Sequence, residues 1–430
     1  MKHAYLLLIA LCVPFSSSNA RAQPSVPYTD ELSGGPTLVR AMEEAPGGGW
    51  FVAGRTRARL EPRADGLAPS SDAFVARLDA RGQLVWVRQW GHNDFEESAS
   101  GLVVTDDELI VAVAENGNGG FFQGVRRYGS AIVHLDHDGS IQRHFPIREL
   151  VSDIARGPRG RLAICGRRLH PTRPTTDFVV SVYSRAGRRQ WTYNTRAPRS
   201  DESCGAIAWR NNQIVAAGSV AAPRGHVQGR FARRIRTDRE PKLDVRLMSR
   251  PLYVVSFNPR GGRRWSRIFQ GAEHYPGDVA IGRGGTTWIT FTNARTLPTP
   301  TGTEPNSTHA SLVAYDSRGA LRLVEHRLME SGPRGRDAVR ASDTGALWMV
   351  SVATSMFPPP PSAAPLSPRA LRAPAVLAVS LDAEPRVAAS VTGVRYPSGF
   401  ASGSTGLAVV GRGCLNDRCG SMFESLQPIH

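Results

Sequence analysis

The chain has 430 residues, of which 53 are Lys or Arg and 37 are Asp or Glu, so its formal net charge at pH 7 is +16. All of the basic residues except Lys2 and Lys242 are arginine. We interpret this skew as a coding bias that leaves a basic soluble surface, which weakens the case for a nucleic-acid partner. After the N-terminal stretch no apolar run reaches the ~18 residues that a transmembrane helix needs, so we expect no such helix.

Residues 1–22 have the features of a secretory signal peptide. A basic start is followed by an apolar stretch, and Ala20-Arg-Ala22 matches an A-x-A cleavage site. Cleavage would leave residues 23–430 as a single repeat domain, exported to the periplasm, the cell surface or the medium. A lipoprotein signal at Cys12 is the alternative, although Leu11 is a poor match to the small residue expected there.

The most informative stretch is a strand–turn–strand unit at residues 72–91. A strand-like run, Phe74–Leu78, leads into the turn Asp79-Ala-Arg-Gly82, where Asp can bond the turn backbone and Gly tolerates positive φ. Four residues after Gly82 stands Trp86, and we expect its indole, with the equivalent indoles of Trp191 and Trp265, to fill the space between adjacent sheets. Turns of this kind recur at Asp136–Gly139, Ser184–Gly187, Asn258–Gly261, Asp316–Gly319 and, in degenerate form, Asp382–Pro385.

Each such hairpin is preceded by another strand pair with its own tight turn, so the unit is strand A, turn, strand B, longer loop, strand C, turn, strand D. Units of this length that contain only strands are typical of propeller blades. We therefore predict an all-β fold, a β-propeller of seven four-stranded blades, with six or eight as alternatives. Residues Val26–Leu32 would supply the missing outer strand of the last blade and close the ring. The predicted blades span residues 37–91, 97–147, 149–196, 203–271, 276–328, 335–393 and 396–426.

The repeat resembles that of the bacterial seven-bladed β-propeller repeat proteins. Asp72-Ala-Phe-Val-Ala-Arg-Leu-Asp79 with Gly82 matches their D-A-F-V-A-x-L-D-x-x-G signature closely, and Asp177-Phe-Val-Val matches it loosely. The unit is also faintly similar to that of quinoprotein-type propellers, but the threonine before their turn glycine is missing here. Neither resemblance transfers a catalytic residue, and a fold is a poor guide to function.

Four cysteines remain after removal of the signal peptide, and an even number in an exported chain suggests disulfides. Cys414 and Cys419 are close in sequence and flank a turn-prone stretch, so we predict a local bridge between them. Cys165 and Cys204 would then pair by elimination. Free buried thiols are the alternative for this second pair.

The connections predict where a partner would bind. The A–B and C–D turns are short, so the insertions should gather on the B–C face, where variable loops on a rigid scaffold commonly bind partners. We expect B–C loops at residues 55–71, 114–129, 219–251, 292–309, 353–374 and 412–420. The arginine-rich loop 221–250 could dock an anionic partner, and residues 356–374 should form an extended polyproline spacer. The candidate binding residues in the first of these loops are Arg230, Arg233, Arg234 and Arg236.

A second candidate site lies at the inner rim of the ring. Asp153, Asp278 and Asp337 occupy equivalent places at the start of strand A, so they could converge on a cation or an amine; capping of the local backbone is the alternative. No metalloprotease, redox, nucleophile-elbow or phosphate-loop motif is present, so we predict no catalytic residue, no metal and no cofactor. Asp343-Thr-Gly345 echoes an Asp-box turn but lacks its flanking hydroxyl residues.

The function that we favour from the sequence is an exported, non-enzymatic scaffold. Its loop-rich face would bind a protein or an anionic polysaccharide at the cell envelope, and we expect a monomer without a nucleic-acid partner. The alternatives are an enzyme, such as a lyase or hydrolase that uses carboxylates at the inner rim, a degenerate quinoprotein, and a purely structural envelope component. Whether the chain is an enzyme stays open at this point.

Overall fold

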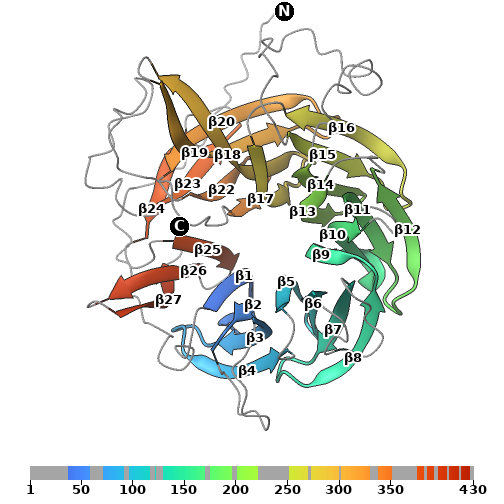
Figure 1. Ribbon diagram of the computed structural model, residues 1–430. Helices are drawn as coiled ribbons and strands as arrows, with labels where there is room; N and C mark the ends of the chain where they lie inside the picture. Colours follow the sequence, from blue (N-terminus) through green and yellow to red (C-terminus); the bar gives the residue numbers. More distant parts are fainter. Residues whose placement is uncertain are drawn as a thin grey trace, which may run out of the picture.

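The described residues form seven β-sheets arranged as a ring, which confirms the predicted β-propeller (Figure 1). Six sheets have four antiparallel strands each, and the seventh has three described strands. The propeller agrees with the resemblance to bacterial propeller repeat proteins. The computed structural model describes residues 37–58, 71–91, 96–116, 122, 129–169, 175–195, 201–220, 251–269, 273–299, 302–329, 338–350, 375–381, 385–391, 396–403, 406–415 and 418–426.

Each sheet is built from strands that follow one another in the chain. The first three sheets comprise β1 (Thr37–Glu44), β2 (Trp50–Thr56), β3 (Asp72–Leu78) and β4 (Leu84–Trp90); β5 (Glu96–Val104), β6 (Leu109–Asn116), β7 (Gly129–Leu135) and β8 (Ile141–Ile147); and β9 (Leu150–Arg156), β10 (Leu162–Leu169), β11 (Thr176–Tyr183) and β12 (Arg189–Asn194). The fourth and fifth comprise β13 (Ser203–Arg210), β14 (Gln213–Ser219), β15 (Leu252–Phe257) and β16 (Arg263–Phe269); and β17 (Glu273–Ile281), β18 (Thr287–Thr299), β19 (Gly302–Tyr315) and β20 (Leu321–Met329). The sixth and seventh comprise β21 (Ala338–Ala341), β22 (Gly345–Val350), β23 (Ala375–Ser380) and β24 (Arg386–Ser390); and β25 (Tyr396–Gly403), β26 (Gly406–Leu415) and β27 (Arg418–Leu426).

The first strands of the sheets lie toward the centre of the ring, and the fourth strands, where one is described, lie at the circumference (Figure 1). Each innermost strand contacts the innermost strand of the next sheet, and β25 contacts both β21 and β1, so the ring is closed by packing. A short 3₁₀ turn, Pro158–Gly160, is the only helical element among the described residues. None of the described helical segments is long and apolar enough to cross a membrane. The predicted closing strand, Val26–Leu32, lies outside the described residues.

Six innermost strands carry a β-bulge at the same place. The extra residue lets the strand bend and twist more strongly where the sheets converge. It also leaves polar groups free to reach sideways, as when the Ser100 hydroxyl donates to the Val151 carbonyl of the next inner strand at 2.7 Å. The residues skipped by the pairing are Arg40, Ser100, Ser152, Gly205, Gly277 and Ser398.

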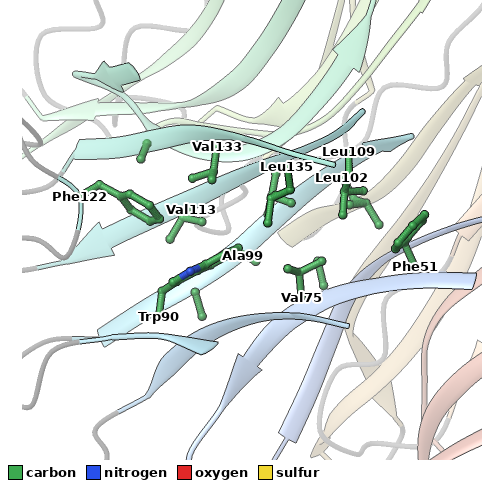
Figure 2. Close-up of a cluster of buried hydrophobic side chains, with 14 of the residues drawn as sticks. Phe51, Val75, Trp90, Ala99, Leu102, Leu109, Val113, Phe122, Val133 and Leu135 are labelled. Carbon is green, nitrogen blue, oxygen red and sulfur yellow. The ribbon is translucent and has the colours of Figure 1, made fainter. Parts of the chain in front are cut away.

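The core lies between the sheets, because every sheet buries both faces against its neighbours. Figure 2 shows one such layer, in which Phe51 and Val75 of the first sheet face Leu102, Val113 and other apolar residues of the second. Burial of an aliphatic or aromatic side chain of this size stabilises a fold by about 1.5–3 kcal/mol. This explains why strands such as β2 and β3 are apolar on both faces rather than alternating.

The tryptophans of the outer strands fill the space between adjacent sheets, as the sequence predicts. The ring of Trp191 lies against Gly261, where a Cβ atom would come within 3.0 Å of it. Its Nε1 donates to the Pro259 carbonyl in the C–D turn of the next sheet at 3.1 Å. Trp86 and Trp265 make the same bond to the next C–D turn. One indole therefore packs against a turn and also satisfies its backbone.

The predicted pairing of Cys165 with Cys204 is confirmed by a disulfide that joins β10 to β13, in neighbouring sheets. Both residues are fully buried. Cys414 and Cys419 are register partners on the backbones of β26 and β27. Their side chains lie outside what the structure describes, so the bridge between them stays a prediction.

Two of the predicted B–C loops, residues 292–309 and 412–420, are wrong. In the first range β18 and β19 pair as far as Thr299 and Gly302, and in the second β26 and β27 pair as far as Leu415 and Arg418. Threonine is enriched in strands, and the antiparallel backbone pairing extends beyond the flanking strands of the blade. By contrast, the predicted loops at 55–71, 114–129, 219–251 and 353–374 do separate strands B and C, although most of their residues lie outside the described ranges.

Candidate functional site

Two of the three predicted rim carboxylates can be placed, and they do lie on innermost strands. Asp153 on β9 and Asp278 on β17 each come directly after the bulge of their strand, so they occupy equivalent positions. Asp337 lies outside the described residues, as do Arg230, Arg233, Arg234 and Arg236 of the loop 221–250. The candidate site among the described residues is therefore the inner rim.

The carboxylate of Asp153 connects two neighbouring blades. Its Oδ1 accepts the N–H of Ile154 at 2.8 Å, and its Oδ2 accepts the N–H of Ile207 on β13 of the next blade at 2.9 Å. The bulge provides these donors, because it displaces the backbone from the regular ladder. Hydrogen bonds to a carboxylate are shorter and stronger than those between neutral groups.

Asp278 repeats this arrangement two blades further on. Its Oδ1 accepts the N–H of Val279 at 2.7 Å, and its Oδ2 accepts the N–H of Val339 on β21 at 3.2 Å. The Asp278 N–H in turn donates to Thr290 Oγ1 at 2.9 Å. Both aspartates thus fasten one innermost strand to the next, in agreement with the backbone-capping alternative.

A guanidinium group stands among these carboxylates. Nη2 of Arg340, on β21, donates to the Met42 carbonyl at 3.2 Å and to Glu43 Oε1 at 3.1 Å, both at the end of β1. The blades of β21 and β1 are not neighbours, because the blade of β25 lies between them. The Glu43 charge raises the pKa of Arg340; burial opposes this, and Asp278 and Asp153 add to the increase. The centre of the ring therefore combines three acidic groups with one permanent cation.

The charged groups of this arrangement already have partners within the protein, so few of their atoms are available to react with or bind a ligand. Each oxygen of Asp153 and of Asp278 already accepts an N–H group, and Glu43 is paired with Arg340. In the part of the chain that the structure describes, no three His, Cys, Asp or Glu side chains are grouped as metal ligands. The cluster is suited to fastening inner strands together.

Sequence reasoning missed a set of buried glutamates. Glu97, Glu149 and Glu202 each stand three residues before the bulge of their innermost strand, and all are at most 5% exposed. Glu149 accepts hydrogen bonds from Arg168 and, at 3.2 Å, from the Tyr183 hydroxyl. The signal that could have found them is a glutamate at one fixed position in three consecutive repeats.

A further buried carboxyl lies in the second blade. Glu115 on β6 is the register partner of Glu97 on β5, and it is 1% exposed. Burial raises the pKa of Glu115 to about 7, and the Phe122 N–H, which donates to Oε1 at 3.0 Å, opposes this increase. This carboxyl therefore titrates near neutral pH inside the protein.

The chain is similar to known proteins in fold alone. No family model and no curated protein sequence matches the chain. Among solved structures, BamB from Moraxella catarrhalis is similar with a TM-score of 0.43 at 10% identity, over 90% of this chain and 85% of that chain. The β-propeller domain of the Trilobed protease from Pyrococcus furiosus has a TM-score of 0.46 at 9% identity, over 92% and 95% of the two chains. Polysaccharide lyase Uly1 has a TM-score of 0.49 at 8% identity, over 93% and 91%. Values this low assign no function to this chain.

Proposed function

We propose that this chain is an exported, non-enzymatic β-propeller that binds a protein or polysaccharide partner through its B–C face. The observation that carries the proposal is the unequal length of the connections. Every A–B and C–D connection has five residues or fewer, whereas B–C connections include residues 57–71, 220–251 and 351–374. In an up-and-down blade the long connections all leave from one face of the ring, where variable segments on a rigid frame commonly bind partners.

Export is supported by two independent features. The N-terminal 22 residues have the composition and cleavage signature of a secretory signal. The buried Cys165–Cys204 disulfide belongs to a class of bond that persists in oxidising compartments outside the cytosol.

The use of the rim carboxylates supports a binding role over catalysis. Asp153 and Asp278 hydrogen-bond to the backbone of the next blade, which is a structural task. The grouping of Glu43, Asp153 and Asp278 near Arg340 is nevertheless the observation that favours the alternative, a lyase or hydrolase. Release of unsaturated or reducing ends from an acidic polysaccharide by the purified chain, lost in Asp278→Asn, would establish that alternative.

The binding proposal is tested by shortening the long connections. Residues 221–250 and 356–374 are each replaced by a short Gly/Ser linker, and the partner captured from native envelope by the intact chain is then purified. We expect its affinity for the shortened chain to fall by at least about tenfold, since binding energy concentrates in a few residues of an interface. In a matched control the same residues are kept in scrambled order, which separates a specific contact from bulk charge. Unchanged affinity after shortening would refute the proposal.

A further inference from the structure

The face opposite the B–C connections carries a concentration of arginine that the proposed function does not use. It lies on the C–D turns and the first residues of the outer strands in the third, fourth and fifth blades. All six side chains are exposed. We call this set the arginine rim, and it consists of Arg188, Arg189, Arg260, Arg263, Arg264 and Arg318.

The indole contacts between blades make the rim continuous. Trp191 follows Arg188 and Arg189 on β12 and donates to the Pro259 carbonyl, directly before Arg260. Trp265 follows Arg263 and Arg264 on β16 and donates to the Ser317 carbonyl, directly before Arg318. β12 and β16 are the outer strands of neighbouring blades, green and yellow in Figure 1. Each pair of arginines before a tryptophan therefore lies near the turn arginine of the following blade.

The turns of the third and fourth blades lack the negative charge found in other copies, whereas the turn of the fifth blade keeps it in Asp316. In the first two blades the leading turn residue is Asp79 or Asp136, whose Oδ1 accepts two turn N–H groups. In the fourth blade Asn258 accepts the same two bonds, at 2.9 and 3.0 Å. In the third blade the hydroxyl of Ser184 accepts one of them. The turn geometry is thus retained while the carboxylate is replaced by a neutral group.

The rim charge is also little compensated, although the charges of Asp316 and Arg318 attract each other. None of the six guanidinium groups is within ion-pair distance of a carboxylate in the described part of the chain; Asp316, beside Arg318, pairs with Arg322 at 3.5 Å. A coding bias toward arginine would act on every blade equally. On the same face of the second blade, however, the exposed turn residues include Asp106, Asp107 and Asp138. The concentration is therefore specific to one sector of the ring.

We propose that the arginine rim binds a linear acidic polysaccharide. Planar guanidinium groups match carboxylate and sulfate groups in bidentate geometry, and a row of them across three blades suits a long polyanion. A single-stranded nucleic acid fits less well, because its bases need exposed aromatic platforms. The rings of Trp191 and Trp265 pack against Gly261 and Gly319 of the adjacent turns.

The experiment compares two quadruple variants of the full chain that remove the same charge. The rim variant carries Arg188→Gln, Arg189→Gln, Arg263→Gln and Arg264→Gln. The control variant carries Arg81→Gln, Arg143→Gln, Arg148→Gln and Arg386→Gln, all exposed residues of other blades. The probes are polygalacturonate and dextran sulfate, with neutral dextran as a blank, and affinity is measured over a range of salt concentrations.

We expect the rim variant to lose at least about tenfold in affinity and to lower the salt slope by about 3, because each of the four arginines contributes about 0.7 on a single-stranded polyanion. The control should change by less than about twofold. Equal losses would overturn the proposal, as would tighter binding to single-stranded DNA or to anionic vesicles, or salt-dependent self-association. Loss only on replacement of residues 221–250 would place the polyanion on the B–C face and leave the proposed function standing. If both variants keep the melting temperature of the parent, unfolding is excluded as the cause of weaker binding.

Discussion

At the scale of single residues, the main feature is the number of carboxyl groups buried between strands. Glu97, Glu149 and Glu202 repeat along the ring, and Glu115 lies opposite the first of them. A buried carboxylate costs free energy unless it is paired or hydrogen-bonded. Glu149 obtains that compensation from Arg168 and Tyr183, and the negative charge of Glu149, after burial, helps to raise the pKa of Tyr183.

Glu115 is expected to make stability depend on pH. Its pKa rises from 4.5 in the unfolded chain to about 7 in the folded one, so it is protonated in both states below pH 4.5. Between pH 4.5 and 7 the unfolded chain releases this proton while the folded chain retains it, so up to about 3 kcal/mol of stability is lost. Glu115→Gln should remove this loss and be more stable than the parent at pH 8, as measured by urea midpoints at pH 4.5 and pH 8.

Glu96→Gln is the matched control, because the side chain of Glu96 is 57% exposed at the same end of β5. It should leave the pH dependence unchanged. Equal pH profiles for the parent and Glu115→Gln would show that this carboxyl does not control the titration.

At the scale of the element, the indole contact connects three outer strands, β4, β12 and β16, each to the next C–D turn. It works only if the turn residue under the ring has no side chain. Gly261 has a φ of 89°, and an added Cβ would be 3.0 Å from the Trp191 ring. Glycine is therefore required at position 261 for two reasons, the backbone conformation and the packing of the ring.

Gly261→Ala should consequently destabilise the protein by about 1–2 kcal/mol, through the left-handed conformation and the displaced ring. Gly284→Ala is the control, since an added Cβ there meets nothing within 4 Å; it should be neutral or slightly stabilising. Thermal melting followed by tryptophan fluorescence measures both. Equal effects at the two glycines would contradict the packing argument.

The elements also show how far sequence reasoning extends. The repeated strand–turn–strand hairpin was predictable because its causes are local. Its turn needs Asp79 and Gly82, and Trp86 follows at a fixed spacing. The hairpin ending at Thr299 and Gly302 was not, because its Thr- and Pro-rich sequence has the composition of a loop, and the strand depends on pairing between β18 and β19. The buried glutamates were missed because their burial depends on the neighbouring blade.

At the scale of the whole molecule, Arg340 connects blades that are not neighbours. Its bonds to Met42 and Glu43 pass beside the blade that has three described strands. Sequence reasoning placed carboxylates at the inner rim but could not predict this pair, since nearly 300 residues separate its members, |i−j| being 297. The pairing exists only once the ring has closed.

Loss of this contact should weaken ring closure. Because the side chains of Arg340 and Glu43 are 34% and 37% exposed, we expect Arg340→Met to cost only about 1–2 kcal/mol. Hydrogen exchange should speed up first in β21, β25 and β1. Arg283→Met is the control, because Arg283 pairs with Asp343 at 3.6 Å on the open surface; it should change stability by less than about 0.5 kcal/mol. Protection that falls evenly over all blades would refute a role in closure.

The disulfide between β10 and β13 has a mechanical consequence. It links two adjacent modules in the middle of the chain, whereas the join between β1 and β25 is non-covalent. Tension applied along the polypeptide should therefore unfold the blades on either side of this cross-linked pair first. The chain should reach its full extension only after a reductant is added.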